Sequence, residues 1–109
     1  MNNSSQYHIF LESIRNQAKK ILPPDSKITL FGSRARGDYR ENSDWDIHII
    51  IPGKGRIPFN LLSDYSYPLE TMGIEMGEEI NIIIYTEEEW ENRKNSLLYE
   101  NIKRDGIRL

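Results

Sequence analysis

The residues best suited to chemistry lie in one short stretch, Gly32 to Asp46, which reads GSRARGDYRENSDWD. It begins with a Gly-Ser pair, and the missing glycine side chain lets the backbone come close to a ligand. If this pair leaves a strand and enters a helix, free amide groups and the Ser33 hydroxyl face the same point, which suits a phosphate. Gly32 and Ser33 are therefore candidates for phosphate binding. The alternative for Ser33 is a simple helix N-cap.

Two aspartates follow this turn at a spacing that brings their side chains together. Asp44 and Asp46 stand at the start of an apolar run, and residues i and i+2 of a strand share a face. Paired carboxylates can bind divalent cations, which phosphoryl-transfer sites use to stabilise the attacking and leaving oxygens. The alternative is a solvated turn. A phosphate turn beside paired carboxylates favours chemistry on nucleotides.

Taken together, Gly32 to Gly37 (GSRARG) and Ser43 to Asp46 (SDWD) resemble the signature of the minimal nucleotidyltransferases, in the DNA polymerase β-like superfamily. The likeness extends over essentially the whole chain. It implies that Gly32 and Ser33 bind nucleotide phosphates and that Asp44 and Asp46 bind Mg²⁺ at a two-metal site. Arg34 is a further candidate for nucleotide binding, with pairing to surface acids as the alternative.

The resemblance also implies a reaction and a partner. Members of the family transfer a nucleoside monophosphate from a nucleoside triphosphate, ATP by analogy, to a hydroxyl group and release pyrophosphate. Minimal members are commonly encoded beside a helical HEPN-type protein and act as its antitoxin. The resemblance therefore implies a nucleotidyltransferase fold, an NTP substrate and a helical partner protein.

One position departs from the family pattern. The third catalytic carboxylate is expected within Ile80 to Ile83 (INII), where Asn81 stands instead. An amide offers one neutral oxygen ligand and cannot accept a proton at ordinary pH, so a second metal ion should bind weakly. Glu79 lies in phase with Asn81 and is a hypothetical substitute ligand, the alternative being that Glu78 and Glu79 form a solvated strand entry. A binding module without turnover is the competing hypothesis for function.

Several neighbours of the motif are predicted to be structural. His48 shares the face of Asp46, yet a packed, hydrogen-bonded histidine is favoured over a ligand. Trp45 points to the opposite face and is a predicted core residue. Arg36 is expected to tie the turn to the rest of the domain, whereas Lys54 and Arg56 are expected in a solvated loop.

The elements that must position these residues follow from apolar periodicity and from turn residues. Strands are predicted over 27–31, 44–51 and 80–85 because these runs are short, apolar and β-branched. Helices are predicted over 7–22, capped by Ser4 or Ser5, and over 58–72, 95–104 and a short stretch at 33–37.

A capping box formed by Thr86 and Glu89 begins a further helix, and Gly106 is expected to end the last helix in the left-handed conformation. The apolar face of the 58–72 helix is expected to comprise Phe59, Leu61, Leu62 and Tyr65. Helices alternating with strands predict an α/β (α+β) fold with a small mixed sheet flanked by helices.

Composition sets the remaining bounds. The 109 residues predict a single domain, 1–109, and the net charge of -3 argues against general nucleic-acid binding. The absence of cysteine suits a reducing cytoplasm, and no apolar run is long enough for a membrane span. The edges of so small a sheet favour homodimerisation as a second mode of association.

Overall fold

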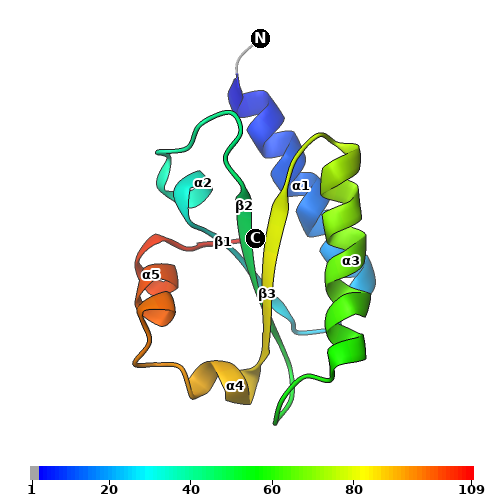
Figure 1. Cartoon of the computed structure of the whole chain (residues 1–109), viewed down its shortest axis with the longest axis vertical. Helices are drawn as coiled ribbons and strands as arrows, with labels where there is room; N and C mark the ends of the chain where they lie inside the picture. Colours follow the sequence, from blue (N-terminus) through cyan, green and yellow to red (C-terminus); the bar gives the residue numbers. More distant parts are fainter. Residues whose placement is uncertain (1–2) are drawn as a thin grey trace.

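Four strands form one mixed sheet in the computed structural model, which describes residues 3–109 (Figure 1). The strand order is β3-β2-β1-β4, with β2 and β3 parallel and β1 antiparallel to both β2 and β4. This mixed α+β architecture confirms the predicted fold class. In chain order the elements are α1 (Asn3–Ile21), β1 (Lys27–Phe31), α2 (Ser33–Arg36), β2 (Trp45–Ile51), α3 (Phe59–Glu75), β3 (Ile80–Thr86), α4 (Glu87–Glu91), α5 (Leu97–Asp105) and β4 (Ile107–Arg108).

The sheet register places the predicted site residues in one row. Phe31 of β1 pairs with Asp46 of β2, and Asp46 pairs with Asn81 of β3. Because paired residues on neighbouring strands point to the same face, all three side chains belong to one side of the sheet. The next row on that side contains Thr29, His48 and Ile83. The predicted metal ligands are therefore brought together by strand pairing.

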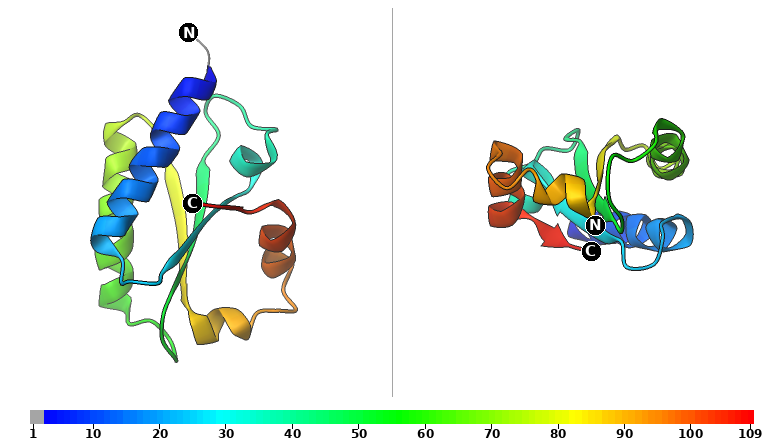
Figure 2. Two further views of the ribbon diagram at one scale, coloured as in Figure 1. Left: turned by 180° about the vertical axis from the view of Figure 1, so that it is seen from behind. Right: turned by 90° about the horizontal axis from the view of Figure 1, so that it is seen from below.

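The opposite side of the sheet carries the hydrophobic core. Helices α1 and α3 lie together on this side, as the two views in Figure 2 show. Alternation along β2 sends Trp45, Ile47, Ile49 and Ile51 into this layer, so the prediction that Trp45 is a core residue is confirmed. The buried helical residues that meet them are Phe10, Ile14, Ala18 and Leu69.

Of the three short helices, α2 and α5 lie beside β1, whereas α4 follows β3 and packs against β3 and β2 (Figure 2). The capping box predicted at the start of α4 is confirmed, since Thr86 and Glu89 exchange both hydrogen bonds. Among residues 3–109, no helix combines the length and the apolar content that crossing a bilayer would require.

Two predictions about α3 are wrong. Phe59 was expected on the apolar face, but it is the first residue of the helix and its side chain is 82% exposed. The helix also continues beyond residue 72 to Glu75, with Pro68 inside it. Proline removes one backbone hydrogen bond, yet burial of Leu69 against the sheet outweighs that cost.

The ends of the first and last helices also differ from expectation. Helix α1 begins at Asn3, so neither Ser4 nor Ser5 is its N-cap. Gly106 ends α5 with φ -65° and ψ 141°, which is an extended and not a left-handed conformation. A Cβ at Gly106 would lie 2.5 Å from the Ile102 carbonyl oxygen and 2.7 Å from Thr29 Cγ2. The glycine is needed for close packing of α5 against β1, not for its backbone angles.

Candidate nucleotide-binding site

The turn between β1 and α2 lies directly against β2. Gly32 has φ +75° and ψ -159°, a conformation that is essentially restricted to glycine. A Cβ at this position would lie 2.3 Å from Asp46 Oδ2, so only glycine lets the turn come this close to the carboxylate. Ser33 is the first residue of α2 and not its N-cap, and within residues 3–109 its hydroxyl has no hydrogen-bond partner. The hydroxyl is therefore available to a ligand.

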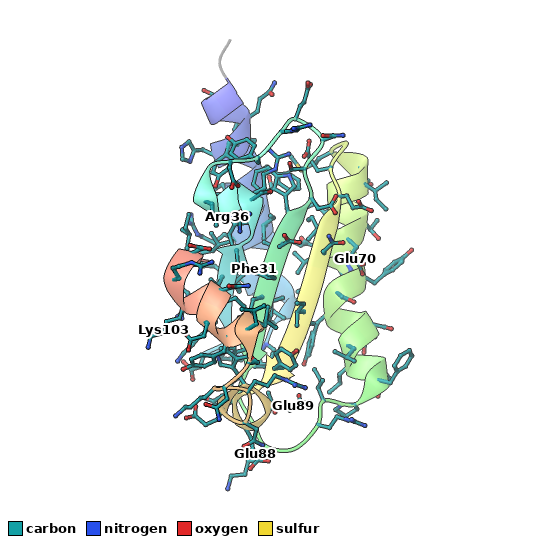
Figure 3. All side chains as sticks on the ribbon, turned by 60° about the vertical axis from the view of Figure 1, so that its left-hand side comes forward. Phe31, Arg36, Glu70, Glu88, Glu89 and Lys103 are labelled. Atoms are coloured by element: carbon teal, nitrogen blue, oxygen red, sulfur yellow. The ribbon has the colours of Figure 1, made fainter. Side chains whose placement is uncertain are left out.

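Asp44, Asp46 and Asn81 form one hydrogen-bonded group. The Asn81 amide nitrogen donates to Asp44 Oδ2 at 3.0 Å and to Asp46 Oδ1 at 3.4 Å. Two carboxylates that would otherwise repel each other thus converge on one neutral side chain. Figure 3 views this face of the sheet, with Phe31 and Arg36 beside it and Glu70 of α3 on the far side.

The environment of Asp46 disfavours its charged form. Burial raises the pKa of Asp46 above its ordinary value, and the neighbouring charge of Asp44 raises it further. The hydrogen bond from Asn81 and the charge of Arg36 act in the opposite direction. The net effect is a raised pKa, so the protein itself compensates the negative charge of Asp46 only in part.

Glu79 lies next to this group, as its phase with Asn81 predicted. Strand β3 begins only at Ile80, but the Glu79 carbonyl accepts the Trp45 amide at 2.9 Å and extends the pairing by one residue. A side-chain hydrogen bond with Asp44 and the charge of Asp44 both raise the pKa of Glu79. Whether Glu79 substitutes for the missing carboxylate stays a prediction.

The donor set fits one hard cation better than two. Asp44 and Asp46 offer carboxylate oxygens, which suit Mg²⁺. The Asn81 nitrogen faces both carboxylates, so its carbonyl oxygen can become a ligand only when the amide turns over. Across residues 3–109, no group of three or more His, Asp or Glu side chains has an arrangement that could hold a metal ion. The weak binding of a second metal ion, expected from the replacement of the third carboxylate, stays a prediction.

The two arginines of the motif differ in burial: Arg36 is partly exposed, whereas Arg34 is buried. Arg36 is half-exposed and pairs with Asp38 at 3.2 Å and with Asp105 of α5 at 3.9 Å, so it ties the turn to the last helix as predicted. Arg34 is 6% exposed, and its guanidinium bonds to the backbone of residues 41 and 43 and to Glu78. These partners occupy the guanidinium within the protein, and nucleotide binding by Arg34 stays a prediction.

Glu78 is the residue whose role the sequence reasoning missed. The sequence suggests only that Glu78 and Glu79 could form a solvated entry to the strand. In the structure, one Glu78 carboxylate oxygen accepts hydrogen bonds from the Trp45 indole at 2.7 Å and from Arg34 at 3.4 Å. Strand alternation was the signal that could have found it, because neighbours in an extended segment point to opposite faces. Glu79 therefore faces the site, whereas Glu78 faces the layer behind it.

His48 is packed beneath the site, as predicted. Its side chain is 1% exposed and its ring centroid lies 4.1 Å from that of Trp90. The predicted hydrogen bond is wrong for Nε2, which has no partner among residues 3–109. The rings of Tyr85 and Trp90 pack against the imidazole. Burial lowers the pKa of His48 to about 4, and the charge of Arg108 contributes in the same direction.

This pKa makes the stability of the fold depend on pH. The unfolded chain binds a proton at His48 near pH 6.5, whereas the folded chain does so only near pH 4. We expect His48 to contribute about 3 kcal/mol to the loss of unfolding free energy between pH 7 and pH 4. Urea titrations of wild type and His48→Leu at both pH values measure this contribution, with His8→Gln at the exposed histidine as the control. An equal loss in wild type and His48→Leu would contradict it.

Comparisons with known proteins identify the family of the chain. Residues 11–107 match the family described as nucleotidyltransferase domain. A protein of Methanocaldococcus jannaschii, named as a candidate protein adenylyltransferase, is 31% identical over 106 residues, covering 97% of this chain and 96% of its own. The chain belongs to the nucleotidyltransferase domain family.

Two solved structures share the fold. A toxin-antitoxin crystallised with AMP-PNP superposes with a TM-score of 0.63 at 16% identity, covering 89% of this chain and 69% of that one. A candidate nucleotidyltransferase from Sulfolobus solfataricus gives 0.63 at 21% identity, covering 99% and 86%. At these identities the likeness establishes the architecture, and the nucleotidyltransferase fold implied by the sequence motif is confirmed.

Proposed function

We propose that this chain binds ATP together with Mg²⁺ and transfers the adenylyl group to a hydroxyl of a protein acceptor. The observation that carries the proposal is the convergence of Asp44 and Asp46 at Asn81, directly against the Gly32 turn. The family membership supports nucleotidyl transfer. The adenylyltransferase name of the Methanocaldococcus jannaschii relative and the AMP-PNP of the toxin-antitoxin structure support ATP.

In the proposed reaction, the acceptor oxygen attacks the α-phosphorus of ATP. A bond forms between these atoms, the bond from the α-phosphorus to the bridging oxygen breaks, and pyrophosphate leaves. Gly32 and Ser33 hold the phosphates through backbone amides and the free hydroxyl. Glu79, whose pKa is raised beside Asp44, is the carboxylate at the site that can take the acceptor proton.

Asp44 and Asp46 would hold the cation, and the Asn81 carbonyl oxygen would become a further ligand if the amide turned over on cation binding. A bound divalent cation supplies charge neutralisation for the phosphates and for the developing pyrophosphate. The fit rests on two carboxylates within hydrogen-bond reach of one amide and without an arginine or lysine partner within residues 3–109.

The second candidate function is a nucleotide-binding module that acts by complex formation without turnover. Asn81 favours it, because the amide replaces a carboxylate at the centre of the site and cannot accept a proton. One assay distinguishes the two functions, because only the adenylyltransferase is expected to transfer label from ATP to an acceptor.

The proposed acceptor lies on a helical HEPN-type partner, and the proposed location of the pair is the cytoplasm. The toxin-antitoxin fold neighbour supports a partner protein. Homodimerisation through a sheet edge is a further proposal, because β3 is an edge strand of the sheet.

The test is transfer of α-phosphate-labelled ATP into a lysate of the source cell, with Mg²⁺ or Mn²⁺. We expect wild type to label an acceptor and Asp44→Asn to lower labelling at least about a hundredfold. Asp64→Asn, at an exposed acid of α3, is the matched control and should label like wild type. ATP binding without label would favour the binding module, and no ATP binding with either metal would contradict both functions.

A further inference from the structure

The Arg34 side chain lies behind the candidate site and not in it. It lines a cavity of about 430 Å³ together with Tyr7, Phe10 and residues of the loop that follows α2. The other candidate ligands, Gly32, Ser33, Asp44, Asp46, Glu79 and Asn81, do not line this cavity. The Arg34 carbonyl also accepts a hydrogen bond from the Tyr7 hydroxyl at 2.6 Å, which fixes the backbone of α2 against α1.

The guanidinium holds the end of the loop that leads to the first aspartate. Nε and Nη2 donate to the Ser43 carbonyl at 3.2 and 2.9 Å, and Nη2 also donates to the Glu41 carbonyl at 3.1 Å. Its carbon lies 4.5 Å from the Tyr39 ring centroid and 4.4 Å from that of Trp45. A planar group that stacks on rings and donates at two nitrogens is specific to arginine.

The residue after Asp44 is held by the same cluster. The Trp45 indole donates to Glu78 at 2.7 Å, and Glu78 contacts Arg34 at 3.4 Å. The backbone amide of Trp45 donates to the Glu79 carbonyl at 2.9 Å. Both neighbours of Asp44 in the chain are therefore anchored, one through its carbonyl and the other through its ring.

We infer that Arg34 is a positioning residue that sets the place of Asp44 relative to Ser33, and that it is not a phosphate ligand. Arg34 follows Ser33 in α2, and its guanidinium donates hydrogen bonds to the carbonyl of Ser43, the residue before Asp44. Glu78 completes the link by joining the entry of β3 to the same guanidinium. That Ser33 binds phosphate and Asp44 binds a cation rests on the proposed function. The Arg34 contacts that connect the Ser33 turn to the Asp44 loop do not depend on it.

The test compares Arg34→Lys and Glu78→Gln with Arg56→Lys, a control at an exposed arginine of the loop before α3. Three quantities are measured: Mn²⁺ affinity, ATP affinity in EDTA, and amide hydrogen exchange over residues 42–46. A positioning role predicts roughly tenfold weaker Mn²⁺ binding and faster exchange in both variants. It also predicts ATP affinity in EDTA within about twofold of wild type, because no phosphate contact is removed. The control should match wild type in all three quantities.

Two results would overturn the inference. One is a loss of metal-free ATP affinity in Arg34→Lys with Mn²⁺ affinity unchanged, which would make Arg34 a phosphate ligand. The other is unchanged exchange over residues 42–46 in folded Arg34→Lys, which would show that the loop needs no anchor. If wild type binds neither Mn²⁺ nor ATP, the proposed function fails, whereas the exchange measurement still decides the anchoring role. If Arg34→Lys does not fold, Glu78→Gln, at a partly exposed carboxylate, provides the same comparison.

Discussion

An Asn81→Asp variant is expected to bind Mn²⁺ at least about tenfold more tightly than wild type, a gain of about 1.4 kcal/mol. The Asn81 amide lies 3.0 Å from an Asp44 oxygen and 3.4 Å from an Asp46 oxygen, so the new carboxylate would join the two at their meeting point. A third negative charge at this distance strengthens cation binding because each carboxylate adds to the attraction. The new carboxylate is also a base that can take the proton of the acceptor hydroxyl, so the rate of adenylyl transfer should rise.

The same substitution should lower stability in the absence of metal. Three carboxylates would then share a partly buried position without the amide that now donates to two of them. We expect a lower Tm in EDTA and recovery of Tm in Mn²⁺. Mn²⁺ titration and thermal unfolding with and without EDTA measure both effects. Asn16→Asp, at an exposed position of α1, controls for the added charge. Unchanged Mn²⁺ affinity in Asn81→Asp would contradict a cation site at this position.

The second large effect is expected from Gly32→Ala, which adds a single methyl group. Its Cβ would lie 2.3 Å from Asp46 Oδ2 and 3.2 Å from Asp46 Cγ, so the carboxylate or the turn must move. The φ of +75° adds a backbone cost for any residue other than glycine. We expect at least about 2–3 kcal/mol of lost unfolding free energy. Because Asp46 would be displaced, Mn²⁺ affinity should fall roughly tenfold or more.

Gly77→Ala is the control at a glycine that has a positive φ and no close neighbour. Gly77 has a similar φ of +79°, but a Cβ there would have no atom within 4 Å. It should lose only about 1 kcal/mol and keep the Mn²⁺ affinity of wild type. Urea unfolding and Mn²⁺ titration of both variants are the measurements. Equal stability losses in the two variants, with metal binding intact in Gly32→Ala, would show that the turn does not need its close approach to Asp46.

Much of the site could be predicted because its determinants are local. The Gly-Ser turn follows an apolar strand, and the alternation along β2 separates Asp46 and His48 from the buried Trp45. The departure at Asn81 was also visible in the sequence, because its apolar neighbours define the strand. The buried face of α1 follows from helical spacing, which is again a local property.

Other features depend on contacts between distant segments. The pairing of Arg34 with Glu78 joins residues that lie 44 positions apart, and no local pattern indicates which acid the arginine meets. Likewise, Phe59 fits the apolar spacing of its helix, but as the first residue of α3 it is exposed to solvent. The missing partner of His48 Nε2 reflects the approach of Trp90 from α4, which periodicity cannot reveal.

The sequence by itself determined the family, the order of most elements and the side chains that meet at the site. It did so because short-range spacing decides which residues share a strand face and where a turn needs glycine. Only the tertiary structure decided that Asn81 lies between the two aspartates and that Arg34 faces away from them. Those outcomes depend on strand register and on packing between α1, α2 and β3, where the final position of a side chain is set by residues far away in the chain.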